Sequence, residues 1–251
     1  MEYTFPSPAQ ASGDLLYRLN DKNRAIGEMF SRIAPRYDLL NRVLSAGIDR
    51  RWRRAAVAEM SPAMGGRHLD LATGTADMAL EIFRQKGFAA AVAGVDLSVE
   101  MMRIGRGKCV KAGRGPYVSF VRAPGESLPF RDAAFDSACI AFGIRNVVGR
   151  ELGLGEMCRV VRPGGRVVVL EFSVPENPVL GALYRFYFTR ILPWIGGIVS
   201  SRREAYRYLP DSVMAFPSPG EFEAMMRAAG CASVTSRPLT FGIVTLYVGA
   251  R

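Results

Sequence analysis

Between residues 67 and 172, short apolar runs alternate with longer stretches of helical periodicity, and this alternation restricts the fold more than any other feature. Strands are predicted at residues 67–72, 91–95, 117–121, 135–141 and 166–172. Helices are predicted at residues 77–86, at residues 98–111 with Ser98 as N-cap, and near residues 151–161. Such an alternation builds βαβ units, so the sequence predicts an α/β fold with a mostly parallel sheet and helices on both faces.

The N-terminal quarter has a different pattern. Residues 1–13 are rich in Pro, Ser and Ala and are predicted to form a loose arm. Residues 14–60 follow a helical period that Pro35 and Gly47 are expected to divide into short pieces. We therefore expect residues 1–60 to form an N-terminal arm with helices.

The alternation is interrupted again after the last predicted parallel strand. Residues 175–217 are rich in aromatic residues and arginines and indicate a helical insertion. One more helix is predicted at residues 218–229, followed by a closing pair of strands at 233–237 and 240–249. Residues 61–251 are thus expected to form one domain that carries this insertion.

The charge balance favours an anionic partner. The chain has 251 residues, with 33 Lys and Arg against 23 Asp and Glu, so its formal charge is +10. Such a charge favours nucleic acid, acidic lipid headgroups or phosphorylated substrates, without choosing among them. Uncharged stretches fall short of the roughly 18 apolar residues of a membrane span, and the N-terminus has no signal-peptide pattern. We therefore expect a cytoplasmic protein.

The cysteines and the single histidine do not form a metal-binding or catalytic pattern. Four cysteines stand apart from one another, none in a C-x-x-C spacing, which suits a reducing compartment and predicts no metal. His68 begins an apolar run and has no identifiable Ser or Cys partner, so we expect a structural role for it. Serine-hydrolase and cysteine-protease chemistry are not expected.

The loop after the first predicted strand, residues 70–76, is the first candidate for a ligand site. Its small residues and Gly74 allow backbone to approach a ligand beside a helix N-terminus. Asp96 ends the next strand, 20 residues after Ala76, where an acid accepts hydrogen bonds from both ribose hydroxyls of an adenosine ligand. The loop lacks the G-x-G-x-x-G pattern of dinucleotide sites. Because the carboxylate of Asp70 would repel a pyrophosphate and attract the ammonium of a methionine moiety, S-adenosylmethionine is favoured over NAD.

Longer motifs identify the sequence more specifically. They are residues 29–38 (MFSRIAPRYD), 45–53 (SAGIDRRWR), 69–75 (LDLATGT), 95–98 (VDLS), 126–130 (ESLPF), 142–147 (FGIRNV), 162–165 (RPGG), 170–173 (LEFS), 192–196 (LPWIG) and 206–209 (YRYL). With these motifs, the chain from about Met29 to the C-terminus closely resembles the ubiquinone/menaquinone biosynthesis C-methyltransferase family. The resemblance implies a class I, Rossmann-like methyltransferase with a seven-stranded sheet and S-adenosylmethionine above the first two strands.

The resemblance also implies positions for the cofactor contacts. They fall on Asp70, Thr73, Gly74, Asp96, Met101, Pro124, Gly125 and Ala141. The family normally has Asn-Ala where this chain has Pro124-Gly125, Ser where it has Ala141, and a third glycine where it has Ala76. Side-chain hydrogen bonds are lost at these positions, although backbone contacts can survive.

The implied reaction is methylation of a ring carbon of a polyprenylated quinol. An ordinary phenol ionises near pH ~10, so a base or a cation must favour the phenolate that pushes charge onto that carbon. The resemblance places Arg145 and Asn146 there, and we interpret Arg145 as a phenolate stabiliser because arginine is a poor base. Tyr37 and Asp38 are candidates for hydrogen bonds to the quinol oxygens, with helix capping and packing as the alternative.

The insertion and the Arg50–Arg54 run have two interpretations each. The run either shares a contact with lipid headgroups or forms a solvated face. The aromatics form either the core of an extra helical layer or a lid for an isoprenoid tail, whose Arg202 and Arg203 would meet anionic lipid. We expect the lid, and with it a transient contact with the inner face of the membrane. No nucleic acid partner is expected, and the sequence does not decide whether the protein forms a homodimer. Demethylmenaquinol is the expected acceptor. A methoxy-benzoquinol acceptor, an RNA methyltransferase and a noncatalytic quinone-binding protein are the alternatives.

Overall fold

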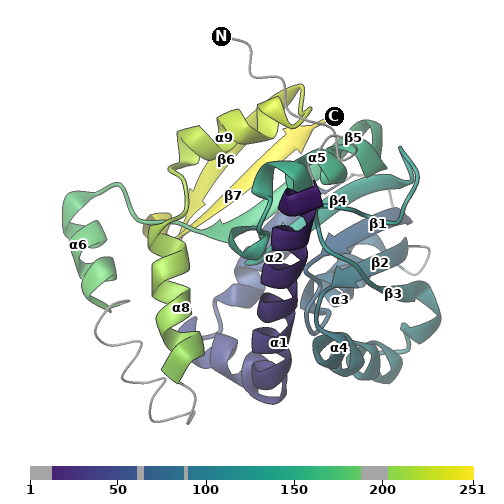
Figure 1. The fold of residues 1–251 in the computed structure, drawn as a ribbon, viewed down its shortest axis with the longest axis horizontal. Helices are drawn as coiled ribbons and strands as arrows, with labels where there is room; N and C mark the ends of the chain where they lie inside the picture. The colour runs from purple at the N-terminus through teal and green to yellow at the C-terminus, as the bar shows by residue number, and fades with distance from the viewer. Residues whose placement is uncertain (1–12, 61–64, 88–89, 188–202) are drawn as a thin grey trace.

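The computed structural model describes residues 13–60, 65–87, 90–187 and 203–251. Its described strands form one seven-stranded sheet in the order β3-β2-β1-β4-β5-β7-β6. The strands are β1 (Gly66–Leu71), β2 (Ala90–Asp96), β3 (Val118–Arg122), β4 (Phe135–Ala141), β5 (Val161–Phe172), β6 (Ser233–Leu239) and β7 (Val244–Ala250). Strands β1 to β5 pair in parallel, whereas β7 runs antiparallel to both β5 and β6. The predicted α/β fold with a mostly parallel sheet is confirmed (Figure 1).

Helices cover both faces of the sheet. The helices are α1 (Gly13–Leu44), α2 (Asp49–Glu59), α3 (Asp77–Lys86), α4 (Val99–Lys111), α5 (Arg150–Val160), α6 (Pro178–Phe186), α8 (Arg203–Met214) and α9 (Pro219–Ala228), with short 3-10 turns at Gly115–Tyr117, Ile144–Asn146 and Thr240–Gly242. Helices α5 and α9 pack on one face and α2, α3 and α4 on the other. Because β5 is covered on both faces, its residues 167–170 are all buried, as expected for a continuous apolar run.

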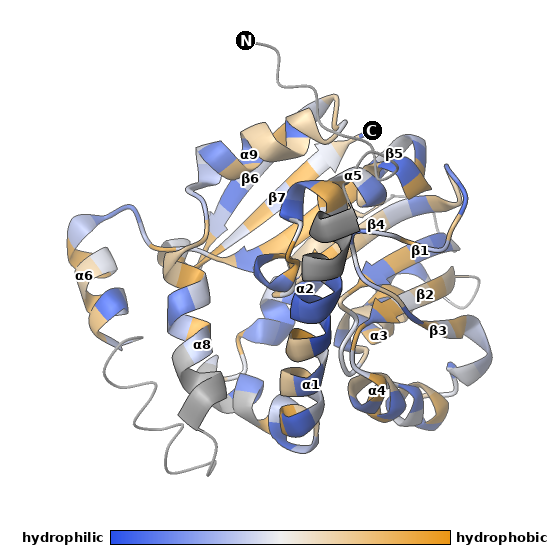
Figure 2. Cartoon of the chain, in the orientation of Figure 1, coloured by the Kyte–Doolittle hydropathy of each residue, from blue (hydrophilic) through white to orange (hydrophobic). Residues whose placement is uncertain are grey.

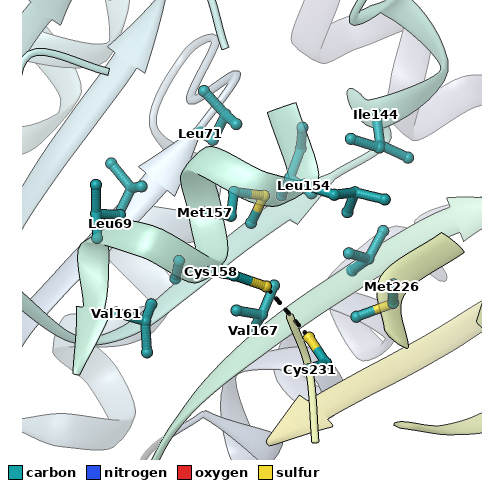
Figure 3. Packing of buried hydrophobic residues seen from close by; sticks show 14 of the residues in the cluster. Leu69, Leu71, Ile144, Leu154, Met157, Cys158, Val161, Val167, Met226 and Cys231 are labelled. Atoms are coloured by element: carbon teal, nitrogen blue, oxygen red, sulfur yellow. Dashed lines mark hydrogen bonds between the residues drawn. The ribbon is translucent and has the colours of Figure 1, made fainter. Parts of the chain in front are cut away.

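The core under α5 and α9 brings two cysteines together. Figure 3 shows Cys158 on α5 facing Cys231, which follows α9, and their Sγ atoms lie 3.4 Å apart as free thiols. Leu154, Met157 and Met226 pack around them. The sequence did not indicate that these two cysteines lie together, because residues 73 positions apart share no local pattern.

His68 is structural, as predicted. Its side chain is fully buried in β1, with Nδ1 at 2.8 Å from Ser137 Oγ and Nε2 at 2.7 Å from the Gly65 carbonyl oxygen. Burial lowers the pKa of His68 below its ordinary value. Both ring nitrogens are therefore occupied: one holds β1 to β4, and the other holds the turn that precedes β1.

The expected break of the N-terminal helix at Pro35 is wrong. Helix α1 is 32 residues long and continues through Pro35 without a break. An interior proline costs a helix about 3 kcal/mol, and tertiary contacts on either side of it offset that cost. Ala34 is buried, and the Asp38 carboxylate is bound by two partners outside the helix. The predicted break at Gly47 is correct, because Gly47 has φ +76° between α1 and α2.

The boundary between the last two strands also differs from the prediction. Strand β6 extends to Leu239, and β7 begins only at Val244. Thr240, Phe241 and Gly242 all have positive φ angles, of 47°, 60° and 86°. Backbone in this left-handed region cannot continue a strand, so the predicted strand start at residue 240 is a 3-10 turn.

Among the described residues, no helix is both long and apolar enough to cross a membrane. Within the same part of the chain, no group of three or more His, Cys, Asp or Glu side chains could hold a metal ion.

Candidate active site

A cavity of about 640 Å³, including the solvent at its mouth, lies where β1, β2 and β4 end, beneath α1. In open α/β sheets, ligands bind beyond the carboxyl ends of the strands. The cavity is lined by Asn23, Ile26, Gly27, Phe30, Tyr37, Leu71, Ala72, Gly74, Val95, Asp96, Leu97, Met101, Ala123, Gly125, Glu126, Ala141, Phe142, Gly143, Asn146 and Val147. Seven sequence-predicted site residues are therefore together in one place: Tyr37, Gly74, Asp96, Met101, Gly125, Ala141 and Asn146.

Asp96 is held rigidly at the end of β2. Its Oδ2 accepts a hydrogen bond of 2.8 Å from the Gly74 backbone N–H, and its Oδ1 accepts one of 2.8 Å from the Ser98 N–H. Burial raises the pKa of Asp96, against these hydrogen bonds, which lower it. The carboxylate keeps further lone pairs for a ligand. Ser98 caps α4 as predicted, because its side chain accepts from the Met101 N–H.

Asp70 and Thr73 lie behind the loop rather than along the cavity. Thr73 Oγ1 donates a hydrogen bond of 2.6 Å to Asp70 Oδ2, and Asp70 is only 1% exposed. Burial raises the pKa of Asp70 from its ordinary 3.8 to about 7, while the Thr73 hydrogen bond lowers it and nearby Asp96 raises it. A cationic ligand group near this loop would favour the ionised form.

The raised pKa makes stability dependent on pH. The folded protein binds the Asp70 proton more tightly than the unfolded chain does. The free energy of unfolding therefore falls as the pH rises from about 4 to about 7. Replacing Asp70 by asparagine is therefore expected to raise the Tm of the ligand-free protein more at pH 8 than at pH 5. Thermal unfolding of both proteins at the two pH values measures this, with Asp132→Asn, an exposed acid, as control. An equal shift at both pH values would contradict it.

Helix α1 is fastened over the cavity at three points. About a third of the way along it, Asn23 Nδ2 donates to Glu126 Oε2 at 3.3 Å. In its middle, the Oγ atoms of Ser31 and Ser98 lie 2.8 Å apart. Towards its end, Asp38 provides the third point. These bonds reach from α1 to segments far away in the sequence, so no local pattern predicts them.

Asp38 does not line the cavity. Its carboxylate accepts hydrogen bonds of 2.6 Å from Thr75 Oγ1 and 2.9 Å from Lys108 Nζ, and Lys108 also pairs with Asp77. Asp38 thereby ties α1 to the loop after β1 and to α4. The neighbouring Tyr37 does line the cavity, with its ring edge-on to Phe30 at 6.3 Å between centroids.

Asn146 and Arg145 stand in the 3-10 turn after β4, on different sides of it. Asn146 lines the cavity, and its Oδ1 accepts a hydrogen bond of 2.9 Å from the Tyr208 hydroxyl of α8. Arg145 is not among the lining residues, and its side chain is 7% exposed. It forms an ion pair with Glu171, 2.7 Å from Arg145 Nη1 to Glu171 Oε1. Pro124 likewise lies outside the cavity, in a neighbouring open groove beside α1.

An aromatic wall adjoins this turn. Phe142 lines the cavity with a φ of +57°, and its ring lies 4.6 Å from that of Phe172 and 6.0 Å from that of Trp52. Arg53 is buried, paired with Asp49 and placed over the Phe142 ring at 5.5 Å. The expectation that the whole Arg50–Arg54 run faces solvent or lipid is therefore wrong for two of its residues. Trp52 is buried against Phe142 and Phe172, and Arg53 is held by an aromatic face and a buried carboxylate.

Several residues of the site were not identified from the sequence. They are Asn23, Phe30, Glu126, Phe142 and Glu171. Four of them stand next to or inside the motifs quoted above, so the motifs marked the segments without showing which side chains face the cavity.

Comparisons with known proteins identify the family of the chain. The model of the ubiE/COQ5 methyltransferase family matches residues 18–251. The ubiquinone/menaquinone biosynthesis C-methyltransferase UbiE of Geobacter sulfurreducens is 52% identical over 236 residues, 94% of this chain and 92% of that protein. The demethylmenaquinone methyltransferase of Thermus thermophilus is 51% identical over 223 residues, 89% of this chain and 100% of that protein.

Solved structures show the same fold at much lower identity. An S-adenosylmethionine-dependent methyltransferase of Thermotoga maritima, described as a possible histamine N-methyltransferase, is similar with a TM-score of 0.61 and 21% identity, covering 90% of this chain and 99% of that one. This structural similarity establishes the class I methyltransferase fold. Since the family model spans most of the sequence and relatives share about half of their residues with it, this chain belongs to the ubiE/COQ5 methyltransferase family.

Proposed function

We propose that the chain transfers the methyl group of S-adenosylmethionine to a ring carbon of a polyprenylated quinol, with demethylmenaquinol as the acceptor. The observation that carries the proposal is the single cavity that contains the Asp96 carboxylate and Asn146 beside apolar and aromatic walls. One wall suits an adenosine and the other suits a flat ring. The names of the relatives support quinone-ring methylation.

The cofactor contacts follow from the cavity. Asp96 would accept from the ribose hydroxyls, with Gly74 and the loop 70–76 beside the methionine end. Met101, 1% exposed and on the cavity wall, would pack on the adenine together with Gly125 and Ala141. Asp70 and Thr73 would support the loop from behind, and Pro124 would act through the backbone. When bound, the cofactor supplies a sulfonium that is already an activated methyl donor.

The acceptor contacts come from α1 and from the turn after β4. Tyr37 and Asn146 line the cavity and would bind the ring oxygens. Arg145, behind the same turn and with a buried Nε that has no partner among the described residues, would stabilise the phenolate as it forms. Asp38 would hold Tyr37 in place through its bonds to Thr75 and Lys108. Residues 1–60 would in this way form part of the substrate cap over the domain of residues 61–251.

Methyl transfer to defined acceptors tests the proposal. The protein is incubated with methyl-labelled S-adenosylmethionine and, in separate reactions, a short-tailed demethylmenaquinol, a methoxy-benzoquinol and total RNA. We expect label in the naphthoquinol fraction. Label in the benzoquinol would change the acceptor, label in RNA would replace the function, and no label with any acceptor would favour a noncatalytic quinone-binding protein.

We further propose that the protein contacts the membrane surface through the outer face of α6. Val179, Leu183 and Phe186 follow the helical period on this face, and their side chains are 73%, 63% and 56% exposed. Figure 2 shows α6, with orange apolar segments, at the outer edge of the molecule. Tyr184 faces inward and packs near Phe172 and Leu209, so an apolar path runs from α6 towards the aromatic wall of the cavity. An apolar face beside a ring site suits a substrate whose tail stays in the bilayer.

Serine at both Val179 and Leu183 is expected to weaken binding to anionic vesicles about thirtyfold, because each apolar side chain contributes on the order of 1 kcal/mol when partly inserted. Vesicle sedimentation measures the effect. Val110→Ser is the matched control, since Val110 is 61% exposed on α4, away from α6. Equal loss in both variants would contradict the assignment. The arginines predicted to meet lipid, Arg202 and Arg203, lie outside the side chains that the structure describes.

A further inference from the structure

Glu171 is a buried acid beside the candidate active site, and the contacts proposed above give it no role in the reaction. It is the last residue but one of β5, and its side chain is fully buried. A carboxylate without water is costly unless a cation and hydrogen-bond donors surround it. Its partners therefore show what it holds.

Glu171 binds both the side chain and the backbone of Arg145. Its Oε1 accepts from Arg145 Nη1 at 2.7 Å and from the Phe172 N–H at 2.9 Å. Its Oε2 accepts from the Arg145 backbone N–H at 3.3 Å. One carboxylate thus fixes the guanidinium and the 3-10 turn Ile144–Asn146 at the same time.

One buried donor of Arg145 has no partner among the described residues. Arg145 Nη1 also donates to the Phe142 carbonyl oxygen at 2.5 Å, and the guanidinium lies over the Phe172 ring at 5.5 Å. Arg145 Nε is buried and has no hydrogen-bond partner in the described residues. A buried N–H without a partner is unfavourable, and an oxygen of a bound ring would remove that penalty.

The same turn carries the substrate-side amide. Asn146 follows Arg145 directly, lines the cavity and is bound by Tyr208 of α8. Whatever fixes the Arg145 backbone therefore also fixes where Asn146 stands. Glu171 and Tyr208 hold this turn from opposite elements, β5 and α8.

We propose that Glu171 is a positioning residue for the methyl transfer: it orients Arg145 and the Ile144–Asn146 turn towards the acceptor ring and compensates the charge of the guanidinium. The proposal rests on the proposed function. In the pair, Arg145 acts as an oriented hydrogen-bond donor and not as an isolated cation, so a neutral quinol can bind beside it without facing an unpaired charge.

Other charged and titratable groups face the Glu171 carboxylate from the elements around it. They are Arg150 of α5, Tyr184 of α6, Tyr208 of α8 and Tyr247 of β7. Burial raises the pKa of each of these tyrosines, so they remain neutral through the range in which enzymes are assayed. If the charge of Glu171 is removed, two guanidiniums, those of Arg145 and Arg150, lose their compensation.

Glu171→Gln separates positioning from a structural role because it keeps the shape and removes the charge. We expect kcat for quinol methylation to fall about 10²-fold, as for a small misplacement of reacting groups, with the Kd for S-adenosylmethionine changed less than threefold. The uncompensated guanidiniums favour the phenolate, so the rising limb of the kcat–pH profile is expected to move to lower pH. In the Arg145→Gln background, Glu171→Gln is expected to cause no further loss of kcat.

The control is Glu176→Gln, the same change at an exposed acid five positions further on, which should leave kcat and the pH profile as in the unchanged protein. A lower kcat with an unmoved pH limb, or independent losses in the double variant, would overturn the positioning role. So would a normal kcat in Glu171→Gln. Failure of the unchanged protein to methylate any quinol would instead reject the proposed function.

Discussion

Replacing Arg145 by glutamine is expected to lower kcat for quinol methylation about 10²–10³-fold, the usual loss when one oriented electrostatic donor is removed. The donor acts on charge that develops in the transition state, so the loss should fall on kcat rather than on ground-state binding. The Arg145 guanidinium binds Glu171 and the Phe142 carbonyl oxygen, and no contact with the cofactor is assigned to it. The Kd for S-adenosylmethionine should therefore stay near that of the unchanged protein.

The buried pair with Glu171 decides which variants are informative. Removing the cation from a fully buried carboxylate typically costs 3–5 kcal/mol of stability. Arg145→Ala also removes every side-chain donor from Glu171, whereas the amide of Arg145→Gln keeps one, so the glutamine variant is the better test and its folding is verified by thermal unfolding. Arg145→Lys keeps the charge and is expected to rescue kcat only in part, because lysine lacks the planar fork that Glu171 and the Phe142 carbonyl bind.

Steady-state kinetics, cofactor Kd and thermal unfolding on the same preparations measure these effects. Near-normal kcat in a folded Arg145→Gln variant would contradict the role of Arg145 and make Tyr37 and Asn146, which line the cavity, the groups to test.

Replacing Asp96 by alanine is expected to weaken S-adenosylmethionine binding at least tenfold. A hydrogen bond to a charged group contributes about 1.5–3 kcal/mol, and Asp96 would make such bonds to the ribose. The same carboxylate holds the Gly74 and Ser98 N–H groups, so its loss also loosens the loop and the start of α4.

Asp96→Asn separates the two effects, because the amide retains one acceptor oxygen for the loop and loses the charge. Calorimetric titration measures the Kd, with circular dichroism to verify folding. Asp132→Ala, an acid 74% exposed outside the cavity, is the control. An unchanged affinity in Asp96→Ala would place the cofactor elsewhere.

Local features of the fold could be predicted from the sequence. Helix α3 has the predicted bounds, Ser98 caps α4, and β4 covers the predicted residues. Asp96 stands at the end of its strand, in the cavity. These features depend on periodicity, capping and strand ends, which neighbouring residues determine.

Features that depend on contacts between residues far apart in the sequence could not be predicted. Asn23 and Glu126 are 103 positions apart, and Arg145 and Glu171 are 26 apart. No sequence spacing shows that α1 closes over the cavity, or that the Arg145 guanidinium turns to a buried acid. Pro35 gave a wrong boundary for the related reason that packing of α1 overrides a local propensity.

The position of the transferred methyl group shows whether the protein methylates a ring carbon of the quinol. The protein is incubated with S-adenosylmethionine carrying a ¹³C methyl group and a short-tailed demethylmenaquinol, and the product is examined by ¹³C NMR and mass spectrometry. We expect one labelled methyl group bonded to the ring carbon next to a hydroxyl-bearing carbon. A label bonded to a quinol oxygen, or a product without label, would contradict it.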